Sequence, residues 1–504
     1  MIPLFTPEQV REMDRRTITG GVPALQLMER ASGHLARAVL AAAGRSYGLR
    51  VALLCGKGNN GGDGIAAARH LAAAGAWPVV CLTSTPDDLS DDAAVQLRRW
   101  RAQGGRVETA PDTTLERADI AVDCLLGTGA SGAPRPPYDV MIDALNASGL
   151  PVVACDLPSG VDAETGAVEA QAVRATVTLS LGAHKRGLAL WPARSYAGEL
   201  RLGDIGVVTD DDSADTHLIT ADDVPALLPE PSNESDKRAR GVVVIVAGSD
   251  DMSGAAALCA RSALAAGAGL VTVATSPLAR RMVAPTVPEA MSLELPPDDP
   301  EAAFERIAGA CERADALAIG PGLGHGPAQV ALVRRCVNEL DLPTVLDADG
   351  INAFRHDAGT LAGHVASTLV ITPHRSELTR LLGEEDSDLW TQRITRVAQV
   401  ARDLGATVVA KGPGSLVAAP DGRMWINDTG TVALATGGTG DVLTGMTVAA
   451  LAAGTGPERV AATVALHGVA GQVAADGGSA RSVTALDVAR AVPHAVARIL
   501  GRRS

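Results

Sequence analysis

Short runs of apolar residues recur throughout this chain, and alanine-rich segments with helical spacing lie between several of them. Each run is apolar at consecutive positions, as expected for strands of a parallel sheet that helices cover on both faces. In the first half these runs are residues 51–54, 79–82, 120–125, 152–155 and 177–181. In the second half they are residues 242–246, 270–274, 316–319, 344–346, 369–371 and 408–410. The pattern therefore predicts two α/β domains with mostly parallel sheets.

One segment interrupts this alternation of apolar runs and helical segments and divides the chain into two halves. Residues 209–240 are rich in acidic residues, Pro, Ser and Asn, a composition typical of a linker. We therefore expect a first domain over residues 1–210, a linker over 211–240 and a second domain over 241–504. The second domain would begin near residue 222 if residues 221–228 form a short docked helix.

Composition excludes several classes of protein. Lys and Arg number 44 against 58 Asp and Glu, a net charge of −14, which disfavours nucleic acid or an anionic membrane as a partner. Because the sequence shows neither a signal peptide nor an apolar run that could span a membrane, a cytoplasmic location is expected. The seven cysteines form no CxxC pair and are expected to be buried thiols. We expect small-molecule substrates and a homo-oligomer.

The first candidate site is the loop after residues 51–54, which reads CGKGNNGGDG over residues 55–64. Gly56, Gly58 and Gly61 match the GxGxxG pattern, whose glycines let the backbone approach a pyrophosphate at a helix N-terminus. An ordinary NAD-binding fold would also place an acidic residue at the end of the next strand, where this chain has Thr83. A tight turn followed by a helix cap is the alternative interpretation.

Two further strand ends carry aspartate and glycine. One reads DCLLGTGASG over residues 123–132, and the other reads DLPSGVD over residues 156–162. A single aspartate at a strand end is more often a cap than a catalyst. Three polar, glycine-rich loops at one edge of a sheet instead predict a binding site, because ligands bind at the carboxyl ends of parallel strands.

Taken in order, these three loops resemble the signature stretches of the NAD(P)HX epimerase domain of the bifunctional NAD(P)H-hydrate repair enzymes, and LMERA over residues 27–31 resembles its leading helix. The resemblance covers about residues 5–210 and implies a Rossmann-like, three-layer α/β/α domain. It also implies that Asp156 is the acid/base and that a potassium ion is held by Asn60, Asp123 and Ser159. The residues that it implies for binding the hydrated dinucleotide are Asn59, Asn60, Gly61, Gly62, Asp63, Gly127, Thr128, Gly129, Ala130, Ser131, Gly132, Ala133 and Asp156.

These residue types suit that chemistry. The hydrated substrate carries a hydroxyl on the ring carbon beside the nicotinamide nitrogen, whose lone pair can expel that hydroxyl as water. The resulting iminium accepts water from either face, and one carboxyl group can serve as acid and base. Asn, Asp and Ser supply hard oxygen donors, which suit an alkali or alkaline-earth cation rather than zinc.

The main candidate site of the second half is TGGTGDVLTG over residues 436–445, followed by an apolar helical stretch at 446–453. Free N–H groups at a glycine-rich helix N-terminus can stabilise a phosphate. Asp441, in the expected first turn, is placed to accept a hydroxyl proton during phosphoryl transfer. The alternative interpretation is a helix cap. The absence of a GxxxxGK[ST] motif excludes a P-loop enzyme.

This half, over about residues 222–500, resembles the ribokinase-like ADP/ATP-dependent NAD(P)HX dehydratase domain of the same family. Matching stretches include GPGLG at 320–324, LDAD at 346–349 and TPH at 372–374. The resemblance implies that Asp441 is catalytic and that magnesium accompanies ADP or ATP. The implied dinucleotide contacts are Ala255, Gly322, His374 and Asp441, and the implied nucleotide contacts are Lys411, Gly412, Pro413, Gly414, Ser415 and Gly440.

Two departures from the family pattern leave local loop shapes open. The sequence Asp236-Lys237-Arg238 stands where the family has His-Lys-Gly, and Ser376 stands where it has Gly.

The resemblance implies a bifunctional metabolite repair enzyme. The first domain would interconvert the R and S hydrates, and the second would phosphorylate the hydroxyl of the S hydrate and eliminate it, since a phosphate ester leaves more readily than hydroxide. Two alternatives remain open: the second half is a small-molecule kinase that releases a phosphorylated product, or the first half is a nucleotide sensor without catalytic activity. Preference for ADP or ATP is also open.

Overall fold

The computed structural model describes residues 1–209, 213–384 and 392–501. The chain forms two compact units, the first over Pro3–Thr216 and the second over Met1–Ile2 together with His217 onward. Residues 210–212, where the expected first domain ends and the expected linker begins, lie outside the described residues. The helix considered at 221–228 is present as a 3-10 turn, η5 (Ala221–Asp223), continued by α7 (Val224–Leu227).

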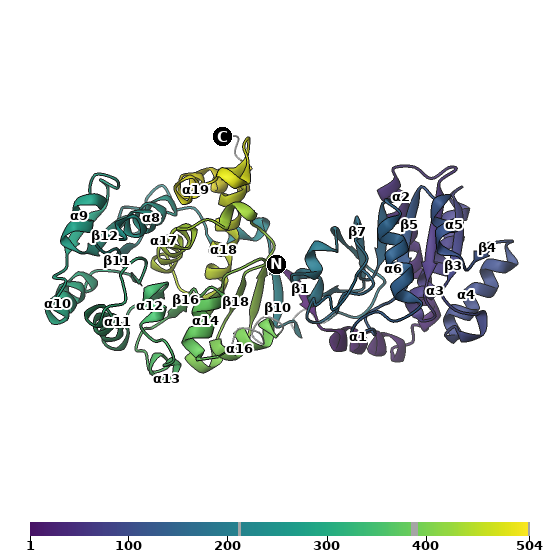
Figure 1. Ribbon diagram of the computed structural model, residues 1–504, viewed down its shortest axis with the longest axis horizontal. Helices are drawn as coiled ribbons and strands as arrows, with labels where there is room; N and C mark the ends of the chain where they lie inside the picture. The colour runs from purple at the N-terminus through teal and green to yellow at the C-terminus, as the bar shows by residue number, and fades with distance from the viewer. Residues whose placement is uncertain (210–212, 385–391, 502–504) are drawn as a thin grey trace. The chain divides into compact units, whose positions relative to one another are not determined.

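The first unit is built on a parallel sheet in the strand order β4-β3-β2-β5-β6-β7-β9, of which β3, β4, β5 and β7 are labelled in Figure 1. The strands are β2 (Arg50–Cys55), β3 (Trp77–Leu82), β4 (Arg106–Glu108), β5 (Ile120–Cys124), β6 (Val152–Cys155), β7 (Val177–Leu181) and β9 (Glu199–Gly203). All five strands expected in this half are present, with ends that differ by at most two residues. The edge strands β4 and β9 are partly exposed and less apolar, which is why the search for apolar runs missed them.

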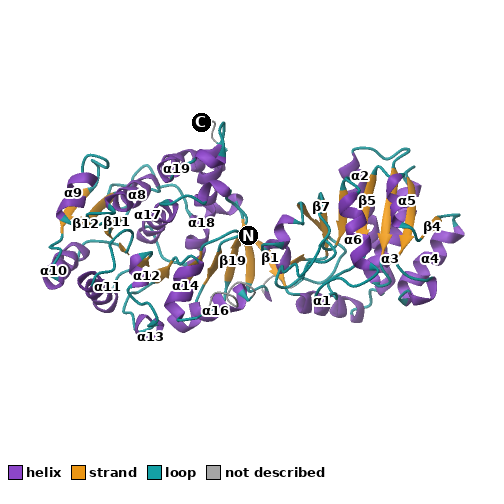
Figure 2. Ribbon diagram, in the orientation of Figure 1, coloured by secondary structure: helices purple, strands orange, loops and turns teal. Residues whose placement is uncertain are grey.

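Helices cover both faces of this sheet and complete three layers, as Figure 2 shows. One face packs against α2 (Ala24–Ala43), α3 (Asn59–Ala73) and α4 (Asp91–Ala102). The other face packs against α5 (Pro111–Glu116) and α6 (Tyr138–Ala147). The predicted Rossmann-like α/β/α fold is therefore confirmed.

The remaining elements of this unit are short or lie outside the three layers. They are β1 (Ile2–Phe5), α1 (Pro7–Thr19), β8 (His184–Lys185) and the 3-10 turns η1 (Pro86–Asp88), η2 (Arg186–Ala189) and η3 (Ala193–Ser195). Strand β1 pairs in parallel with β8 through Leu4 and Phe5, and α1 packs on this pair through Val10 and Met13. This arrangement ties the start of the chain to the segment that follows β7.

The second unit contains a longer sheet in the order β13-β12-β11-β14-β15-β16-β17-β18-β19-β10. Neighbouring strands are parallel from β13 to β17, and the pairs β17–β18 and β18–β19 are antiparallel. All six expected strands are present. The strands are β10 (Thr216–Ile219), β11 (Val242–Val246), β12 (Leu270–Thr275), β13 (Met291–Glu294), β14 (Ala316–Ile319), β15 (Thr344–Leu346), β16 (Leu369–Ile371), β17 (Thr407–Ala410), β18 (Leu416–Ala418) and β19 (Met424–Asn427).

Helices also lie on both sides of this second sheet. Figure 1 shows α8, α17, α18 and α19 on one side, where they share an apolar core with the strands, and α10, α11, α14 and α16 on the other. The predicted ribokinase-like α/β architecture is therefore confirmed. The helices are α8 (Ser253–Ala265), α9 (Pro277–Val283), α10 (Pro300–Cys311), α11 (Pro327–Glu339), α12 (Asp349–Asn352), α13 (Ala358–Leu361), α14 (Arg375–Leu382), α16 (Arg393–Leu404), α17 (Thr439–Ala452), α18 (Pro457–Ala475) and α19 (Ala485–Ile499), and the 3-10 turns are η6 (Val432–Leu434) and η7 (Ala480–Ser482).

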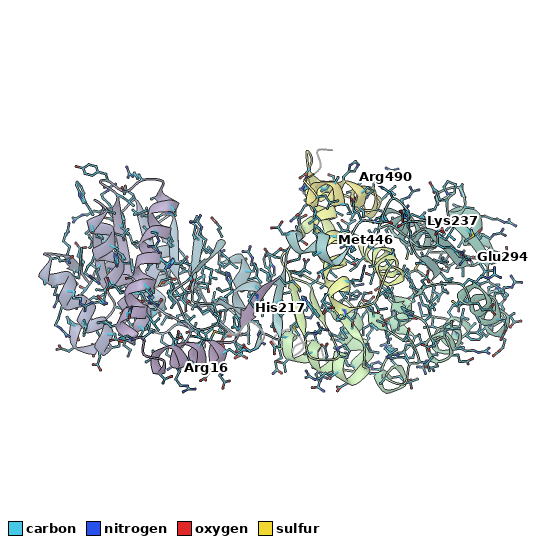
Figure 3. The ribbon with its side chains drawn as sticks, turned by 180° about the vertical axis from the view of Figure 1, so that it is seen from behind. Arg16, His217, Lys237, Glu294, Met446 and Arg490 are labelled. Atoms are coloured by element: carbon cyan, nitrogen blue, oxygen red, sulfur yellow. The ribbon has the colours of Figure 1, made fainter. Side chains whose placement is uncertain are left out.

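Helix α17 is the central helix of the second unit. It is apolar on nearly all sides, as expected for a helix surrounded by protein, and Met446 lies within the unit in Figure 3 while Glu294 lies at its surface. Its amino-terminal turn carries Asp441. The buried body of α17 thus fixes the position of that turn.

In each sheet, the first strands in chain order extend the sheet in one direction from a central strand, and later strands extend it in the other direction. In the first unit the chain passes from β2 to β3 and β4 on one side, and later adds β5, β6, β7 and β9 on the other. In the second unit the same reversal falls between β11 and β14. Loops that leave the two central strands diverge there and open a crevice at the carboxyl ends, where ligands of such sheets bind. The predicted site residues should therefore meet at these two places.

All seven cysteines are free and buried, as the sequence predicts. Within residues 1–209, 213–384 and 392–501, no helix combines the length and apolar character needed to cross a membrane.

Candidate active sites

Close packing explains two of the glycines in the loop between β2 and α3. A Cβ atom at Gly56 would lie 2.0 Å from the carbonyl oxygen of Leu125, and one at Gly61 would lie 1.8 Å from the carbonyl oxygen of Gly56. A Cβ atom at Gly58 would meet nothing within 4 Å, and the neighbouring Asn59 is exposed. The loop is thus packed tightly against the loop after β5 on one side and is open to a ligand on the other.

Three predicted cation ligands come together around the backbone of Leu126. Asn60 Nδ2 donates a hydrogen bond of 2.9 Å to the carbonyl oxygen of Leu126. The N–H of Leu126 donates to Ser159 Oγ at 2.9 Å, and Ser159 Oγ donates to Asp123 Oδ1 at 2.6 Å. The structure therefore brings Asn60 of α3, Asp123 of β5 and Ser159 of the loop after β6 into one cluster.

This cluster has the chemistry of a cation site. Asn60 Oδ1 is buried and has no hydrogen-bond partner among the residues that the structure describes. Burial raises the pKa of Asp123 to about 6, although hydrogen bonds from Ser159 and Leu125 oppose the rise. A cation beside this fully buried carboxyl group would favour its ionised form. Amide, carboxylate and hydroxyl oxygens are the hard donors that such a cation binds.

Asp156 follows β6 in a strained backbone conformation. Its φ of 70° lies in the left-handed region, which residues other than glycine adopt rarely. Asp156 Oδ1 accepts a hydrogen bond of 3.0 Å from the N–H of Leu181 and forms an ion pair with Lys185 Nζ. The Lys185 side chain is 1% exposed, and its Nζ also donates to the carbonyl oxygen of Leu181 at 2.7 Å. Strain that the surroundings maintain in this way is typical of functional sites.

Two further carboxyl groups interact with the Asp156–Lys185 pair. Burial raises the pKa of Asp63 well above its ordinary value, and the charges of Asp156 and Asp14 raise it further while Lys185 opposes them. Burial also raises the pKa of Asp14, which lies in α1. One lysine thus faces three carboxyl groups: it pairs with Asp156, and the pKa values of Asp63 and Asp14 are raised. A raised pKa suits a carboxyl group to the role of acid.

In the second unit, the ends of β15 and β17 are joined by a buried ion pair. Lys411 Nζ donates to Asp347 Oδ1 at 2.8 Å, and Thr444 Oγ1 donates to Asp347 Oδ2 at 2.6 Å. Glu377 Oε2 lies 3.8 Å from Lys411 Nζ. Burial opposes ionisation of Asp347, but Lys411 and the hydrogen bonds bring the pKa of Asp347 below its ordinary value. The pair thus fixes the Lys411 ammonium group at the strand ends, where the Asp347 carboxylate balances its charge.

Asp441 lies close to this ion pair. Burial raises the pKa of Asp441 to about 7, the charge of Asp347 adds to the rise, and Lys411 opposes it. A Cβ atom at Gly440 would lie 3.3 Å from Lys411 Nζ, so the first turn of α17 sits against the lysine. A carboxyl group whose pKa lies near the working pH is suited to act as a general base.

His374 is the N-cap of α14. Its Nδ1 accepts hydrogen bonds from the N–H groups of Ser376 at 3.1 Å and Glu377 at 3.3 Å. In the neutral ring the proton therefore sits on Nε2, which lies 3.3 Å from Glu377 Oε1. A parallel β-bridge joins His374 to Lys411. The structure thus places the predicted dinucleotide contact His374 beside the predicted nucleotide loop.

The other predicted dinucleotide contacts meet at the β11–β14 reversal. Gly322 has a φ of 59°, and a Cβ atom there would lie 2.8 Å from Ala255 Cβ. The N–H of Gly324 donates to Asp349 Oδ2 at 2.9 Å, and the charge of Asp349 also raises the pKa of Asp441. The loops after β14 and β15 are therefore connected, and both face the region of Asp441.

Some of the predicted dinucleotide-binding residues lie away from the cation cluster. The loop of residues 127–133 is exposed at Gly129 and at 131–133, and its closest approach to the cation cluster is at Gly127, where a Cβ atom would lie 3.3 Å from Asn60 Cβ. Within the described ranges, no three His, Cys, Asp or Glu side chains are arranged to hold a metal ion.

Several charged residues at these sites escaped the sequence analysis. Asp347 follows strand β15 directly, so its position at a strand end was a usable signal, whereas Glu377 lies in the first turn of α14, six residues after β16 ends. Lys185 and Asp14 gave no such signal, because Lys185 lies in a two-residue strand and Asp14 lies in a helix far from the glycine loops in sequence.

Each half of the chain matches a known protein family. Residues 243–494 match the family described as NAD(P)H-hydrate dehydratase. Residues 24–187 match the family described as YjeF-related protein N-terminus. The two matches fall on the second and the first unit, respectively.

Similar proteins match over almost their entire length. The bifunctional NAD(P)H-hydrate repair enzyme Nnr of Moorella thermoacetica is 36% identical over 510 residues, which cover 97% of this chain and 96% of that protein. The protein of the same name from Salinibacter ruber is 37% identical over 529 residues, which cover 99% and 97%. Among solved structures, the ADP/ATP-dependent NAD(P)H-hydrate dehydratase of Bacillus subtilis, co-crystallised with ATP and Mg²⁺, is 30% identical with a TM-score of 0.50 and covers 56% of this chain and 98% of its own.

Proposed function

This chain belongs to the family of bifunctional NAD(P)H-hydrate repair enzymes, and we propose that its two crevices divide the family's two reactions between them. The enzyme epimerises the R and S forms of hydrated NADH and NADPH and dehydrates the S form to NAD(P)H with ADP or ATP. The observation that carries this function is the similarity to bifunctional relatives over 97% or more of the chain. The assignment of residues rests on the two strand-end sites described above.

In the first crevice, Asp156 and Asp63 handle the protons of epimerisation. Loss of the hydroxyl requires a proton on the leaving oxygen, and Asp63, whose pKa burial raises well above its ordinary value, donates that proton. The ring nitrogen supplies the electron pair that forms the iminium. Asp156, which pairs with Lys185, accepts a proton from the water that adds to the opposite face. Return of one proton from Asp156 to Asp63 restores the starting state.

Potassium fits the oxygen cluster of the same crevice. Asn60 Oδ1, the Asp123 carboxylate and Ser159 Oγ would hold the ion, whose charge would keep Asp123 ionised and join the loops after β2, β5 and β6. Ser159 Oγ already donates one hydrogen bond and accepts another, which leaves one lone pair for a ligand bond.

We expect potassium to stabilise the wild-type protein through Asp123. A ligand at a hundredfold excess over its Kd stabilises a fold by about 2.7 kcal/mol, which corresponds to about 5–10 °C in Tm for a domain of this size. The Tm should therefore be higher in KCl than in choline chloride at equal ionic strength, and epimerase activity should respond in parallel. Asp123→Asn, which removes the charge, should lose both effects. Equal Tm values of the wild type in the two salts would contradict the assignment.

In the second crevice, Asp441 acts as the general base of dehydration. It takes the proton from the hydroxyl of the S hydrate while that oxygen attacks the terminal phosphorus of ATP, and ADP leaves. The ring nitrogen then expels inorganic phosphate, and loss of a proton from the adjacent ring carbon restores the double bond of NAD(P)H. Lys411, held by Asp347, contacts the phosphates, and the N–H of Gly440 stabilises the transferring group.

Magnesium accompanies the nucleotide in this proposal. The Bacillus subtilis dehydratase that resembles this chain was crystallised with ATP and Mg²⁺, which supports the same requirement here. Asp347, Asp349 and Glu377 are the nearby carboxylates that could contribute an oxygen or hold its water ligands. The ion neutralises phosphate charge in phosphoryl transfer.

The proposal is tested by incubating the full-length protein with mixed NADHX epimers, with and without ATP and Mg²⁺, and separating the species by chromatography. Without nucleotide, an excess of R hydrate should relax towards the epimer equilibrium. With nucleotide, both epimers should disappear, and NADH and inorganic phosphate should form in equal amounts. A stable phosphoester would instead identify a kinase, and unchanged R hydrate in both conditions would identify a nucleotide sensor in the first unit.

A further inference from the structure

Arg393 is a buried cation behind the predicted nucleotide loop. It is the first residue of α16 and is only 8% exposed. Its NH1 donates to the carbonyl oxygen of Pro413 at 2.9 Å, and its NH2 donates to the carbonyl oxygen of Ala410 at 2.9 Å. Burial lowers the pKa of Arg393 to about 10, which leaves the guanidinium charged at neutral pH. Arg393 also lines a small cavity together with His374 and Lys411.

The two hydrogen bonds fix the orientation of the loop's peptide groups. A trans peptide is planar, and its C=O and N–H point in opposite directions. The peptide between Pro413 and Gly414 is trans, and its carbonyl points inward to Arg393. The N–H of Gly414 therefore points away from Arg393, towards the outer side of the loop. Gly414 has a φ of 58°, which glycine adopts without strain.

The rest of the loop supports the same orientation. Ser415 Oγ donates to the carbonyl oxygen of Gly412 at 3.0 Å, so this carbonyl is also engaged within the loop. Lys411 N–H donates to the carbonyl oxygen of Pro373 at 2.9 Å. The carbonyl oxygens of Gly412 and Pro413 are thus engaged, and the N–H of Gly412 donates to Ser415 Oγ at 3.3 Å. The loop therefore offers a ligand the Gly414 N–H beside the Lys411 side chain, and an N–H together with an ammonium group suits an anion.

We propose that Arg393 is a positioning residue for the nucleotide: it orients the 413–414 peptide so that the Gly414 N–H donates to a phosphate oxygen of ADP or ATP, and it sets a positive charge behind the loop. This inference rests on the proposed role of residues 411–415 in nucleotide binding. The guanidinium polarises the peptide through its carbonyl and so strengthens the N–H as a donor. A lysine at this place could keep the charge but not both carbonyl bonds, because only the planar guanidinium spans two acceptors in a fixed geometry.

The test compares Arg393→Met and Arg393→Lys with a matched control in the full-length protein. The control is Arg396→Met: Arg396 lies one turn further along α16, where its Nε donates to Glu384 Oε2 at 3.2 Å. For each variant, calorimetry gives the Kd for ATP with Mg²⁺, dehydration assays give KM for ATP and for S-NADHX, and circular dichroism gives the Tm.

Arg393→Met should raise the Kd and KM for ATP at least about tenfold, as for loss of a buried charged hydrogen-bond donor, while KM for S-NADHX changes less than about twofold. Arg393→Lys should fall between this variant and the wild type, and Arg396→Met should match the wild type. Unchanged ATP affinity in Arg393→Met would overturn the inference. If Arg393→Met fails to fold, the result for Arg393→Lys tests the inference instead. A selective loss of ATP affinity in Arg393→Lys supports the inference, and an equal loss for ATP and S-NADHX overturns it.

Lys411→Met separates this inference from the proposed function. If Lys411→Met binds ATP as the wild type does, residues 411–415 are not the nucleotide site, and their proposed role falls together with that of Arg393. If Lys411→Met weakens ATP binding and Arg393→Met does not, only the role of Arg393 falls.

Discussion

Replacement of Asp441 by asparagine should lower the rate of dehydration by about 10³–10⁴-fold, the upper range for removal of a general base. The amide has the shape of the carboxyl group but cannot accept the hydroxyl proton. Asp441 lies in the first turn of α17, and the buried body of that helix does not depend on its side chain. The measurement is the formation of NADH from S-NADHX with ATP and Mg²⁺, with ATP binding as a check that the site is still formed.

The pH dependence of dehydration by the wild type is a second test of Asp441 as the general base. Because burial raises the pKa of Asp441 to about 7, the carboxyl group becomes protonated as the pH falls below 7, and a protonated base is inactive. The dehydration kcat/KM should therefore fall about tenfold per pH unit below pH 7 and level off above it. The residual activity of Asp441→Asn should lack this dependence. Near-normal dehydration by the variant, or an identical pH profile, would contradict a role as base.

The sheet cores were predictable from the sequence because their strands are buried on both faces. Burial on both faces demands consecutive apolar residues, and every run found in this way became a strand. Strands β4 and β9 were not predictable from apolar runs, since each is an edge strand in which charged and apolar residues alternate, RVE in β4 and ELRL at the start of β9. The apolar stretch expected at 446–453 is the buried body of α17, which begins earlier, at Thr439.

The sites were predictable only where glycine-rich loops mark a strand end or a helix start. Asp123 and Asp156 stand at strand ends beside glycine-rich loops, and Asp441 stands in the first turn of a helix that such a loop begins. The glycines after β2 were interpreted as an approach to a pyrophosphate. At Gly56 the structure gives a nearer reason, which is contact with Leu125 in the loop after β5, and at Gly61 the close approach is to Gly56 of the same loop. Pairings such as Asp156 with Lys185 join residues from different strand ends, and the order of strands in the sheet determines them. No local pattern encodes that order.

Asparagine in place of Asp156 should abolish conversion of the R hydrate, with an expected loss of about 10²–10⁴-fold, while dehydration of the S hydrate persists. Asparagine is the appropriate replacement because it tolerates a φ of 70° better than other residues and keeps an oxygen for the N–H of Leu181. It removes the charge that accepts the proton from water. Chromatography of R- and S-NADHX without nucleotide measures the effect directly.

The same substitution leaves Lys185 buried without its ion-pair partner, which predicts a loss of stability as well as of catalysis. A broken buried pair costs about 3–5 kcal/mol, so the Tm of the first unit should fall. Lys185→Met is the matched control, because it breaks the same pair but keeps the Asp156 carboxyl group. Retained R-hydrate conversion in Lys185→Met, together with its loss in Asp156→Asn, would place the proton transfer on Asp156. If Asp156→Asn converts the R hydrate at the wild-type rate, the carboxyl group is not the base, and the strained turn after β6 serves only to hold Lys185.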